Sequence, residues 1–319
     1  MKSKKIISGL LALSFIFGGT VLPNAVVDST VISASAEKYG LLYYEELDDG
    51  TVKITNFYNY STETDVVIPS EINGKAVIAI GVDAFCGYTI TSITIPDTVY
   101  SIGADAFYGC SNLQKVDMSK NIKNIGSYAF AHCHSLESIT LPEGLQSIDE
   151  SAFYDCDSLK SIEIPASLMN IGEYAFSNCD KLENVTFAER TYSLNIDKCA
   201  FWECKSLKEL DLPDKIIHIG EYAFSNCDSL KRLSLSGDSY FDEDIFSMNP
   251  NLESVTISSG IDTISTHEFS GCKNLKEITI PASVTYIGAN SFSGCIDLVI
   301  KCYKDTAAHK YAIDNDIKY

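Results

Sequence analysis

The densest group of residues that could do chemistry is the segment AHCHS at 131–135. It places His132, Cys133 and His134 next to one another, and imidazole nitrogens and thiolates are typical ligands of Zn²⁺. Adjacent side chains seldom converge on one tetrahedral ion, and Cys133 also belongs to a series of regularly spaced cysteines. We therefore expect no metal site here. The three other histidines that we considered are isolated in the sequence: His218, His267 and His309.

Other chemistry is equally weakly indicated. The segment DSYFDEDIF at 238–246 offers carboxylates for Ca²⁺, but it lacks the glycine-punctuated spacing of a calcium loop, which favours a solvated acidic face. No nucleophile-elbow, zinc-protease, phosphate-loop or dinucleotide motif occurs, and paired carboxylates are uninformative in so acidic a chain. The sequence predicts a protein that is not an enzyme and has no catalytic residues, cofactor or metal.

Regular spacing is the dominant feature of the chain. Ten phenylalanines recur at intervals of 22 to 25 residues. They are Phe85, Phe107, Phe130, Phe153, Phe176, Phe201, Phe224, Phe246, Phe269 and Phe292. Such a period is typical of a solenoid, in which each copy packs on its neighbours. We call the set of residues at one position relative to these phenylalanines a column.

Each position of the copy has a physical task, and the template is A-F-x-x-C-x-x-L-x-x-I-x-I-P-x-x-L-x-x-I-G. The alternation Ile162-Glu163-Ile164 predicts a strand with one buried face, which Pro165 ends, and Gly172 suits a tight corner with positive φ. One copy buries about six apolar side chains, worth roughly 10–15 kcal/mol. Ordering its backbone costs roughly 1–2 kcal/mol per residue, so stacked neighbours must supply the rest.

Eight of the eleven cysteines form one column, three residues after the phenylalanine. They are Cys110, Cys133, Cys156, Cys179, Cys204, Cys227, Cys272 and Cys295. We expect a buried ladder of mostly free thiols, because parallel side chains in register are poorly directed for disulfides and the total is odd. This would imply a reducing or oxygen-poor habitat. Cys86, Cys199 and Cys302 lie outside the column and are the better candidates for a bonded or reactive thiol.

The repeat resembles a known family. Segments such as LKSIEIPASLMNIGEYAFSNCDKL and LKEITIPASVTYIGANSFSGCIDL are similar to the 23-residue leucine-rich repeats of BspA-type, or treponemal-type, bacterial surface proteins, and the resemblance runs from Val66 to about Tyr303. It implies a β-rich α/β-type solenoid, a curved leucine-rich repeat stack with a parallel sheet on its concave face. It also implies export and a role in adhesion or binding. No catalytic residues come with it.

A partner would meet the residues that point outward from the predicted strands. The middle residues of the strands form the putative concave binding face: Thr94, Asp117, Thr140, Glu163, Thr186, Asp211, Ser234, Thr256 and Thr279. Polar residues, Thr above all, also simply suit an exposed strand. A second, speculative surface is an aromatic line of Tyr108, Tyr154 and Trp202 in alternate copies. If copies rise by about 5 Å, these rings have a spacing suited to the sugars of a glycan.

The ends of the chain predict the remaining organisation. Lys2, Lys4 and Lys5 precede an apolar run and Ala34-Ser35-Ala36, so residues 1–36 are predicted to be a secretory signal peptide. Residues 37–65 form an N-terminal β cap with a hairpin at Asp49-Gly50, 66–303 the repeat domain of about ten copies, and 304–319 a short helical C-terminal cap with Asp305 as its N-cap. We see no sorting motif.

The net charge and the predicted export limit the possible partners and location of the protein. The net charge of −19 becomes −21 without residues 1–36, which hold three lysines and one aspartate. This argues against nucleic acid or an anionic membrane as partner. We expect a secreted or cell-surface monomer that binds an extracellular protein or glycan and has no membrane insertion after signal removal. The alternative is a structural envelope protein or the non-catalytic recognition part of a larger secreted assembly.

Overall fold

The computed structural model describes residues 36–58, 63–237 and 240–319. The predicted signal segment, apart from its last residue, lies outside these ranges, as do Tyr60 and Asp238. Residues 35–319 form one compact unit, and it is this unit that we describe. No helix among the described residues is long and apolar enough to cross a membrane.

The predicted strands form a parallel series along the solenoid. In order they are β4 (Asp65–Val67), β7 (Ser92–Thr94), β9 (Lys115–Asp117), β12 (Ser161–Ile164), β14 (Asn184–Phe187), β16 (Glu209–Asp211), β18 (Arg232–Leu235), β20 (Ser254–Ile257), β22 (Glu277–Thr279) and β24 (Val299–Lys301). Strands β4–β7–β9 form one sheet and β12 to β24 another. Between β9 and β12 only a bridge from Ser138 to Ser161 continues the pairing. We call this series the first sheet.

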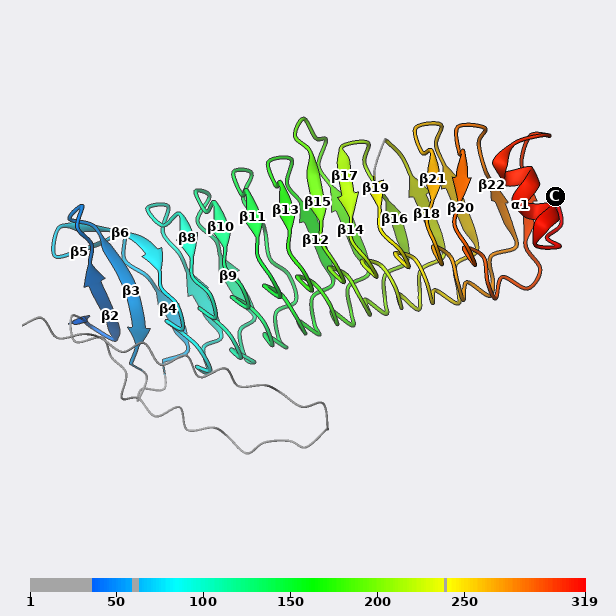
Figure 1. The fold of residues 1–319 in the computed structure, drawn as a ribbon. Helices are drawn as coiled ribbons and strands as arrows, with labels where there is room; N and C mark the ends of the chain where they lie inside the picture. The colour runs from blue at the N-terminus through cyan, green and yellow to red at the C-terminus, as the bar shows by residue number, and fades with distance from the viewer. Residues whose placement is uncertain (1–35, 59–62, 238–239) are drawn as a thin grey trace, which may run out of the picture. The chain divides into compact units, whose positions relative to one another are not determined.

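A second series of parallel strands runs beside it, which the sequence did not predict. Its strands are β3 (Val52–Phe57), β6 (Lys75–Ile80), β8 (Ser101–Ile102), β10 (Asn124–Ile125), β11 (Ser147–Ile148), β13 (Asn170–Ile171), β15 (Leu194–Ile196), β17 (Ile216–Ile219), β19 (Tyr240–Phe241), β21 (Thr263–Ile264) and β23 (Tyr286–Ile287). Figure 1 shows both series of arrows, which repeat from one turn of the chain to the next. The fold is a β-solenoid with parallel sheets, and its predicted curvature stays a prediction.

The two ends differ from the repeats. At the N-terminal end β1 (Glu37–Tyr39), β2 (Leu42–Glu46) and β3 pair antiparallel, and Asp49-Gly50 lies in the predicted turn between β2 and β3. A second hairpin joins β5 (Glu71–Ile72) to β6. At the other end is α1 (Ala307–Asp314), the only helix among the described residues. Its N-cap is Thr306 and not Asp305: the Thr306 hydroxyl accepts from the His309 N–H.

The ten phenylalanines form a continuous pile of buried rings. Successive ring centroids lie 5.0 to 5.9 Å apart, and the planes differ by 2° to 13°. Phe57 continues the pile at the N-terminal end, and Tyr311 of α1 closes it edge-on at the other. Backbone bonds such as Phe130 N–H to the Ala152 carbonyl, at 2.7 Å, join the same turns. The pile fixes the rise of the solenoid.

The repeated glycine does not adopt the positive φ that the sequence suggested. Gly172 and its equivalents have no positive φ; instead, a Cβ on Gly172 would lie 2.6 Å from the backbone of Asp149 in the preceding turn. Glycine therefore permits close approach of two turns. Positive φ occurs two residues before and two residues after the phenylalanine, as at Ser151 and Asp155 around Phe153.

The cysteine column has a more specific task than filling space. The thiol of each column cysteine donates a hydrogen bond to the carbonyl of the preceding turn's phenylalanine, at 3.0 to 3.5 Å. Where Asn249 takes the place of cysteine, its amide donates to the equivalent carbonyl of Phe224. The column thus supplies a donor to a carbonyl that faces the core.

All eleven cysteines are unpaired in the structure. Burial raises the pKa of Cys110 and of Cys227 to about 12, which disfavours the reactive thiolate. The three cysteines outside the column, which were the better candidates for a bonded or reactive thiol, are also unpaired. Burial raises the pKa of Cys86 to about 11 and also raises the pKa values of Cys199 and Cys302.

The irregular copies keep the stack continuous. In the copy AERTYSLNID, Ala188 stands where a proline is usual. Arg190, two residues later, is buried, and its guanidinium donates to the carbonyls of Pro165 and Leu168 in the preceding turn. The register between β15 and β17 shifts by a bulge at Leu194, yet both strand series pair on through this region. The extra residues are absorbed in the turn.

We predict that Phe153→Ala lowers the free energy of unfolding by roughly 3–5 kcal/mol, because it opens a cavity inside the ring pile. Urea unfolding followed by circular dichroism measures the loss. Phe153→Leu is the control and should cost clearly less, since it keeps most of the buried volume. A loss under about 1 kcal/mol for the alanine variant would contradict a core role for the pile.

We also predict that a thiol reagent detects close to eleven free thiols per chain when the protein is denatured without reductant. The native protein should react slowly, since burial hides the sulfur atoms and raises the thiol pKa values. Detection of only one or two thiols after denaturation would show that the cysteines pair.

Candidate functional site

The predicted binding face lies on the outward side of the first sheet. Neighbouring strands align its members one above another: Thr94 pairs with Asp117, Glu163 with Thr186, and Asp211 with Ser234. Thr94 and Ser234 are half-buried, and the other seven predicted residues are exposed. Thr140 falls in the break between β9 and β12 and belongs to no strand. The structure therefore gathers these residues into one surface column.

A second outward column runs beside the first, two residues earlier in each strand. It contains Lys115, Ser138, Ser161, Asn184, Glu209, Arg232, Ser254 and Glu277. Arg232 forms an ion pair with Glu209, and Lys301 pairs with Glu277. Among the described residues, no ion pair reaches Asp117, Glu163 or Asp211 of the first column. These three exposed carboxylates leave the face locally negative.

The break in the first sheet makes a hollow on this face. Residues 114–118, Lys120 and 138–143 surround a volume of about 630 Å³. Lys115, Asp117, Ser138 and Thr140 of the two columns contribute to its wall, together with apolar atoms of Leu141. Because residues 138–141 form only one bridge, the pleated surface is interrupted here. The face therefore combines a polar strip with one recess.

The predicted aromatic line belongs to the turns and not to this face. Tyr108, Tyr154 and Trp202 are all half-buried. Tyr108 and Tyr154 both make edge-to-face contacts with His132, which lies between them, at centroid distances of 5.1 and 5.5 Å. Asn178 donates to the Tyr154 hydroxyl at 3.0 Å. These contacts engage two of the three rings, and stacking of sugars on the line stays a prediction.

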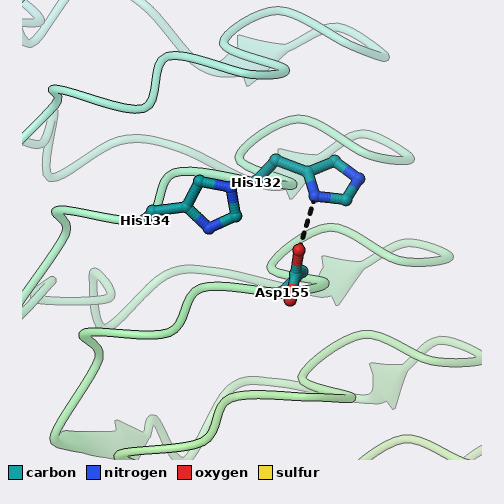
Figure 2. A group of neighbouring side chains, drawn as sticks. All are labelled: His132, His134 and Asp155. Atoms are coloured by element: carbon teal, nitrogen blue, oxygen red, sulfur yellow. Dashed lines mark hydrogen bonds and ion pairs between the residues drawn. The ribbon is translucent and has the colours of Figure 1, made fainter. Parts of the chain in front are cut away.

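One group among the described residues has ligand atoms close enough to hold a metal ion. It consists of His132, His134 and Asp155, whose ligand atoms all lie within 4.8 Å of one another. Figure 2 shows the imidazole of His132 directed at the Asp155 carboxylate of the next turn. Sequence reasoning missed Asp155, although the repeat places YDCDS one period after AHCHS. Cys133 is buried and its thiol donates to the Phe107 carbonyl, so it takes no part.

The family follows from comparison of this repeat with known proteins. The family model described as the BspA type leucine rich repeat region matches residues 78–195 and 191–299. The chain belongs to the BspA-type leucine-rich repeat family. Comparison with curated proteins gave no match.

Solved structures of other leucine-rich repeat proteins are similar in fold to this chain. A leucine rich cell surface protein of Faecalibacterium prausnitzii A2-165 is 24% identical over 88% of this chain and 98% of its own, with a TM-score of 0.57. A leucine-rich repeat protein of Bacteroides ovatus ATCC 8483 is 24% identical over 89% and 98%, with a TM-score of 0.51. At this identity the likeness shows the fold alone.

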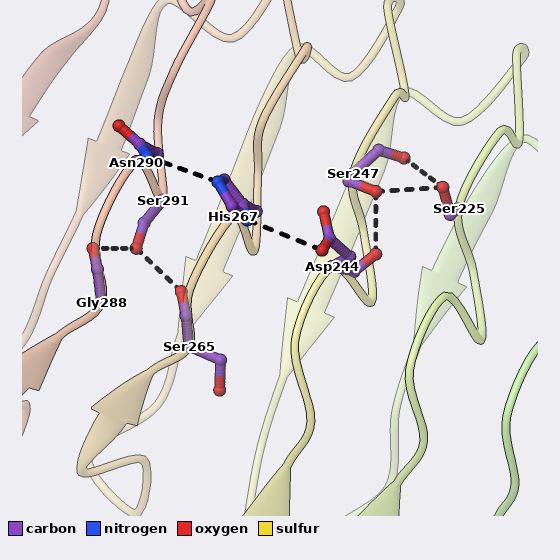
Figure 3. A network of polar contacts seen from close by, with 8 residues as sticks. All are labelled: Ser225, Asp244, Ser247, Ser265, His267, Gly288, Asn290 and Ser291. Carbon is purple, nitrogen blue, oxygen red and sulfur yellow. Dashed lines mark hydrogen bonds and ion pairs between the residues drawn. The ribbon is translucent and has the colours of Figure 1, made fainter.

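The last BspA-type copies carry a polar network in their turns. Figure 3 shows His267 between Asp244, at 3.7 Å, and Asn290, at 3.3 Å. The buried hydroxyls of Ser225, Ser247 and Ser291 donate to backbone carbonyls. None of the contacts drawn joins His267 to a serine hydroxyl, so the group lacks the nucleophile–base pair of a hydrolase. The serines serve the backbone.

Glu268 is the one buried side chain of this region with no partner for either carboxylate oxygen. It is 1% exposed and stands in the column that holds alanine in seven copies. Burial raises the pKa of Glu268 to about 8, so the carboxyl is largely protonated at neutral pH. The proton replaces the missing counter-charge.

We predict that Glu268 makes stability fall with rising pH. The folded pKa lies above the ordinary value of 4.5, so the folded state binds the proton more tightly. Its contribution is therefore full below pH 4.5 and is lost as the pH rises through about 8, by up to about 1.4 kcal/mol per pH unit. Urea unfolding of the wild type and of Glu268→Gln from pH 5 to 8 measures the difference.

The wild-type curve should fall relative to that of the neutral variant, while exposed Glu173→Gln, the control, should follow the wild type. Parallel curves for the wild type and Glu268→Gln would show that Glu268 does not carry the proton.

Proposed function

We propose that this chain is a non-catalytic, exported surface protein that binds an extracellular macromolecule through the two outward columns of the first sheet. The single observation behind the proposal is the alignment of exposed polar residues in register along that sheet. An extended, rigid strip of this kind is the surface that solenoid proteins commonly use for recognition. The description of the Faecalibacterium prausnitzii relative as a cell surface protein supports the location.

The charge of the strip favours a protein partner with a basic surface. Asp117, Glu163 and Asp211 are exposed and have no ion-pair partner among the described residues. The whole chain carries a net charge of −19, which would attract a basic partner over a distance and repel an acidic glycan. A neutral glycan would instead rely on the hydroxyl-rich positions such as Thr186 and Thr256.

Two measurements test the proposal. Fractionation of cells that express the protein should place it outside the cytoplasm, and a blot that finds it only in the cytoplasm would exclude this function. Purified chain is then applied to arrays of immobilised extracellular proteins and neutral or acidic glycans. Binding to basic proteins that weakens as salt rises supports the preferred partner class.

We predict that the double substitution Glu163→Ala and Asp211→Ala weakens such a partner's affinity and flattens its salt dependence. Stability should change by less than about 1 kcal/mol, because exposed charges on a strand contribute little. Surface plasmon resonance at several salt concentrations measures binding, and urea unfolding measures stability.

The matched control removes two exposed carboxylates elsewhere, by Glu173→Ala and Asp262→Ala. If both double variants bind as tightly as the wild type, the first sheet is not the binding face. If both lose affinity equally, only the net charge matters, and the columns have no specific role.

A further inference from the structure

Two histidines and two aspartates of successive turns face one another beside the ring of Tyr154. His132 Nδ1 lies 2.7 Å from Asp155 Oδ2, and His134 Nδ1 lies 3.2 Å from Asp157 Oδ2. The imidazole rings of His132 and His134 have centroids 5.8 Å apart. The four side chains thus form two neighbouring pairs, with the histidines on one turn and the aspartates on the next.

The backbone holds this arrangement in register. The His132 N–H donates to the Tyr154 carbonyl at 2.8 Å, and the Asp155 N–H donates to the Ser177 carbonyl at 2.9 Å. Three turns are therefore joined at this level. Tyr108 and Tyr154 hold the ring of His132 edge-to-face from both sides. The histidine is oriented before any ligand arrives.

Backbone conformation explains the residue types of only two of the four side chains, His132 and Asp155. His132 and Asp155 occupy a column with positive φ, 60° and 59°, where histidine and aspartate are favoured over most side chains. His134 and Asp157 have no positive φ. Their column also holds Asp180 and Asp228, besides threonine, serine, lysine, proline and isoleucine, so aspartate is usual there and His134 is its only histidine. Both histidines occur in one turn and their facing carboxylates in the next.

His134 also has an unsatisfied atom. Its Nδ1 is covered from solvent and makes no hydrogen bond, although Asp157 Oδ2 is only 3.2 Å away. The distance is short enough for attraction, but the direction does not suit a hydrogen bond. A buried ring nitrogen without a hydrogen bond is costly, and a ligand between the rings and the carboxylates would satisfy it.

We propose that His132, His134 and Asp155 bind a divalent transition-metal ion, Zn²⁺ foremost, with Asp157 or water as the fourth ligand. Two imidazole nitrogens with one or two carboxylate oxygens suit Zn²⁺, whereas Ca²⁺ and Mg²⁺ prefer oxygen alone. Bonds of about 2.0–2.2 Å place tetrahedral ligand atoms about 3.3–3.6 Å apart. The present spread of up to 4.8 Å therefore requires small side-chain rotations.

The ion would tie two consecutive turns together. His132 and Asp155 are 23 residues apart in sequence, and the unfolded chain does not hold them close. Binding to the folded state alone would stabilise it by mass action. The side chains keep 29 to 46% of their exposure, so an ion can reach the group from solvent once the small side-chain rotations uncover the His134 nitrogen. The site is independent of the proposed binding face.

The competing reading is that these are two ordinary His–Asp ion pairs. The chain offers a matched control for it: His218 Nε2 lies 3.1 Å from Asp242 Oδ2, with similar exposure but without a second histidine. His218→Ala removes one such pair and leaves the proposed site intact. His134→Ala removes one ion pair and breaks the proposed site.

The test uses the full chain, freed of metal with EDTA and then titrated with ZnCl₂ by calorimetry, with thermal unfolding measured with and without Zn²⁺. Wild type and His218→Ala should bind about one Zn²⁺ per chain and melt at a higher temperature with it. His132→Ala and His134→Ala should each bind at least about tenfold more weakly and lose the thermal shift. Co²⁺ should give the intense visible absorption of a tetrahedral site only where both histidines are present.

All four proteins should unfold in one cooperative transition in EDTA, which shows that the variants fold. The proposal is overturned if the wild type binds no Zn²⁺, if His132→Ala and His134→Ala bind it as the wild type does, or if His218→Ala loses binding to the same extent. If a histidine variant fails to fold, Asp155→Asn takes its place, and it should weaken Zn²⁺ binding while keeping the side-chain volume.

Discussion

The distance between successive turns is the constraint on which the rest of this structure depends. The phenylalanine rings stack at 5.0 to 5.9 Å, and backbone bonds of the same turns, such as Phe153 N–H to the Ala175 carbonyl at 2.7 Å, hold that interval. Every residue therefore lies directly against its equivalents one turn before and one turn after. A side chain is acceptable in a column only if it can pack against the side chains above and below it.

This rule explains residues that look unrelated in the sequence. Gly172 lets two turns approach closely, since a Cβ there would meet the backbone of the preceding turn at 2.6 Å. The thiol of Cys156 is suited to its column because it is small and can donate to the Phe130 carbonyl. Glu268 departs from the rule, since nothing above or below it pairs with its carboxylate. Burial raises the pKa of Glu268 to about 8, which favours the protonated carboxyl.

Much of the fold could be predicted because the period alone identifies a stack. The strands of the first sheet followed from the alternation in segments such as Ile162-Glu163-Ile164, which is long enough to show a period of two. The second series of strands could not be predicted in this way, since most of its members, such as Ser101–Ile102, have too few residues to alternate. The role of Gly172 and the capping by Thr306 depend on contacts across turns and on local φ, which the sequence does not display.

The candidate sites differ in how far the sequence determines them. The outward columns were predictable because the direction of a strand residue follows from its parity. The His132–Asp155 contact was not predicted, because Asp155 is one full period away from His132 in the sequence. The residues adjacent to His132 in the sequence are Cys133 and His134. In a solenoid, residues one repeat length apart in the sequence are neighbours in space, so the members of a ligand set occur in the same column of successive copies.

The positive φ of the column of His132 also favours particular residue types there. Glycine, asparagine, aspartate and histidine adopt this conformation most readily, and the last three have side chains that can bind ions or donate and accept hydrogen bonds. The positive φ of this column thus places polar side chains one above another, at the interval set by the phenylalanine pile. Groups that can bind an ion in this fold are therefore formed by residues of successive turns.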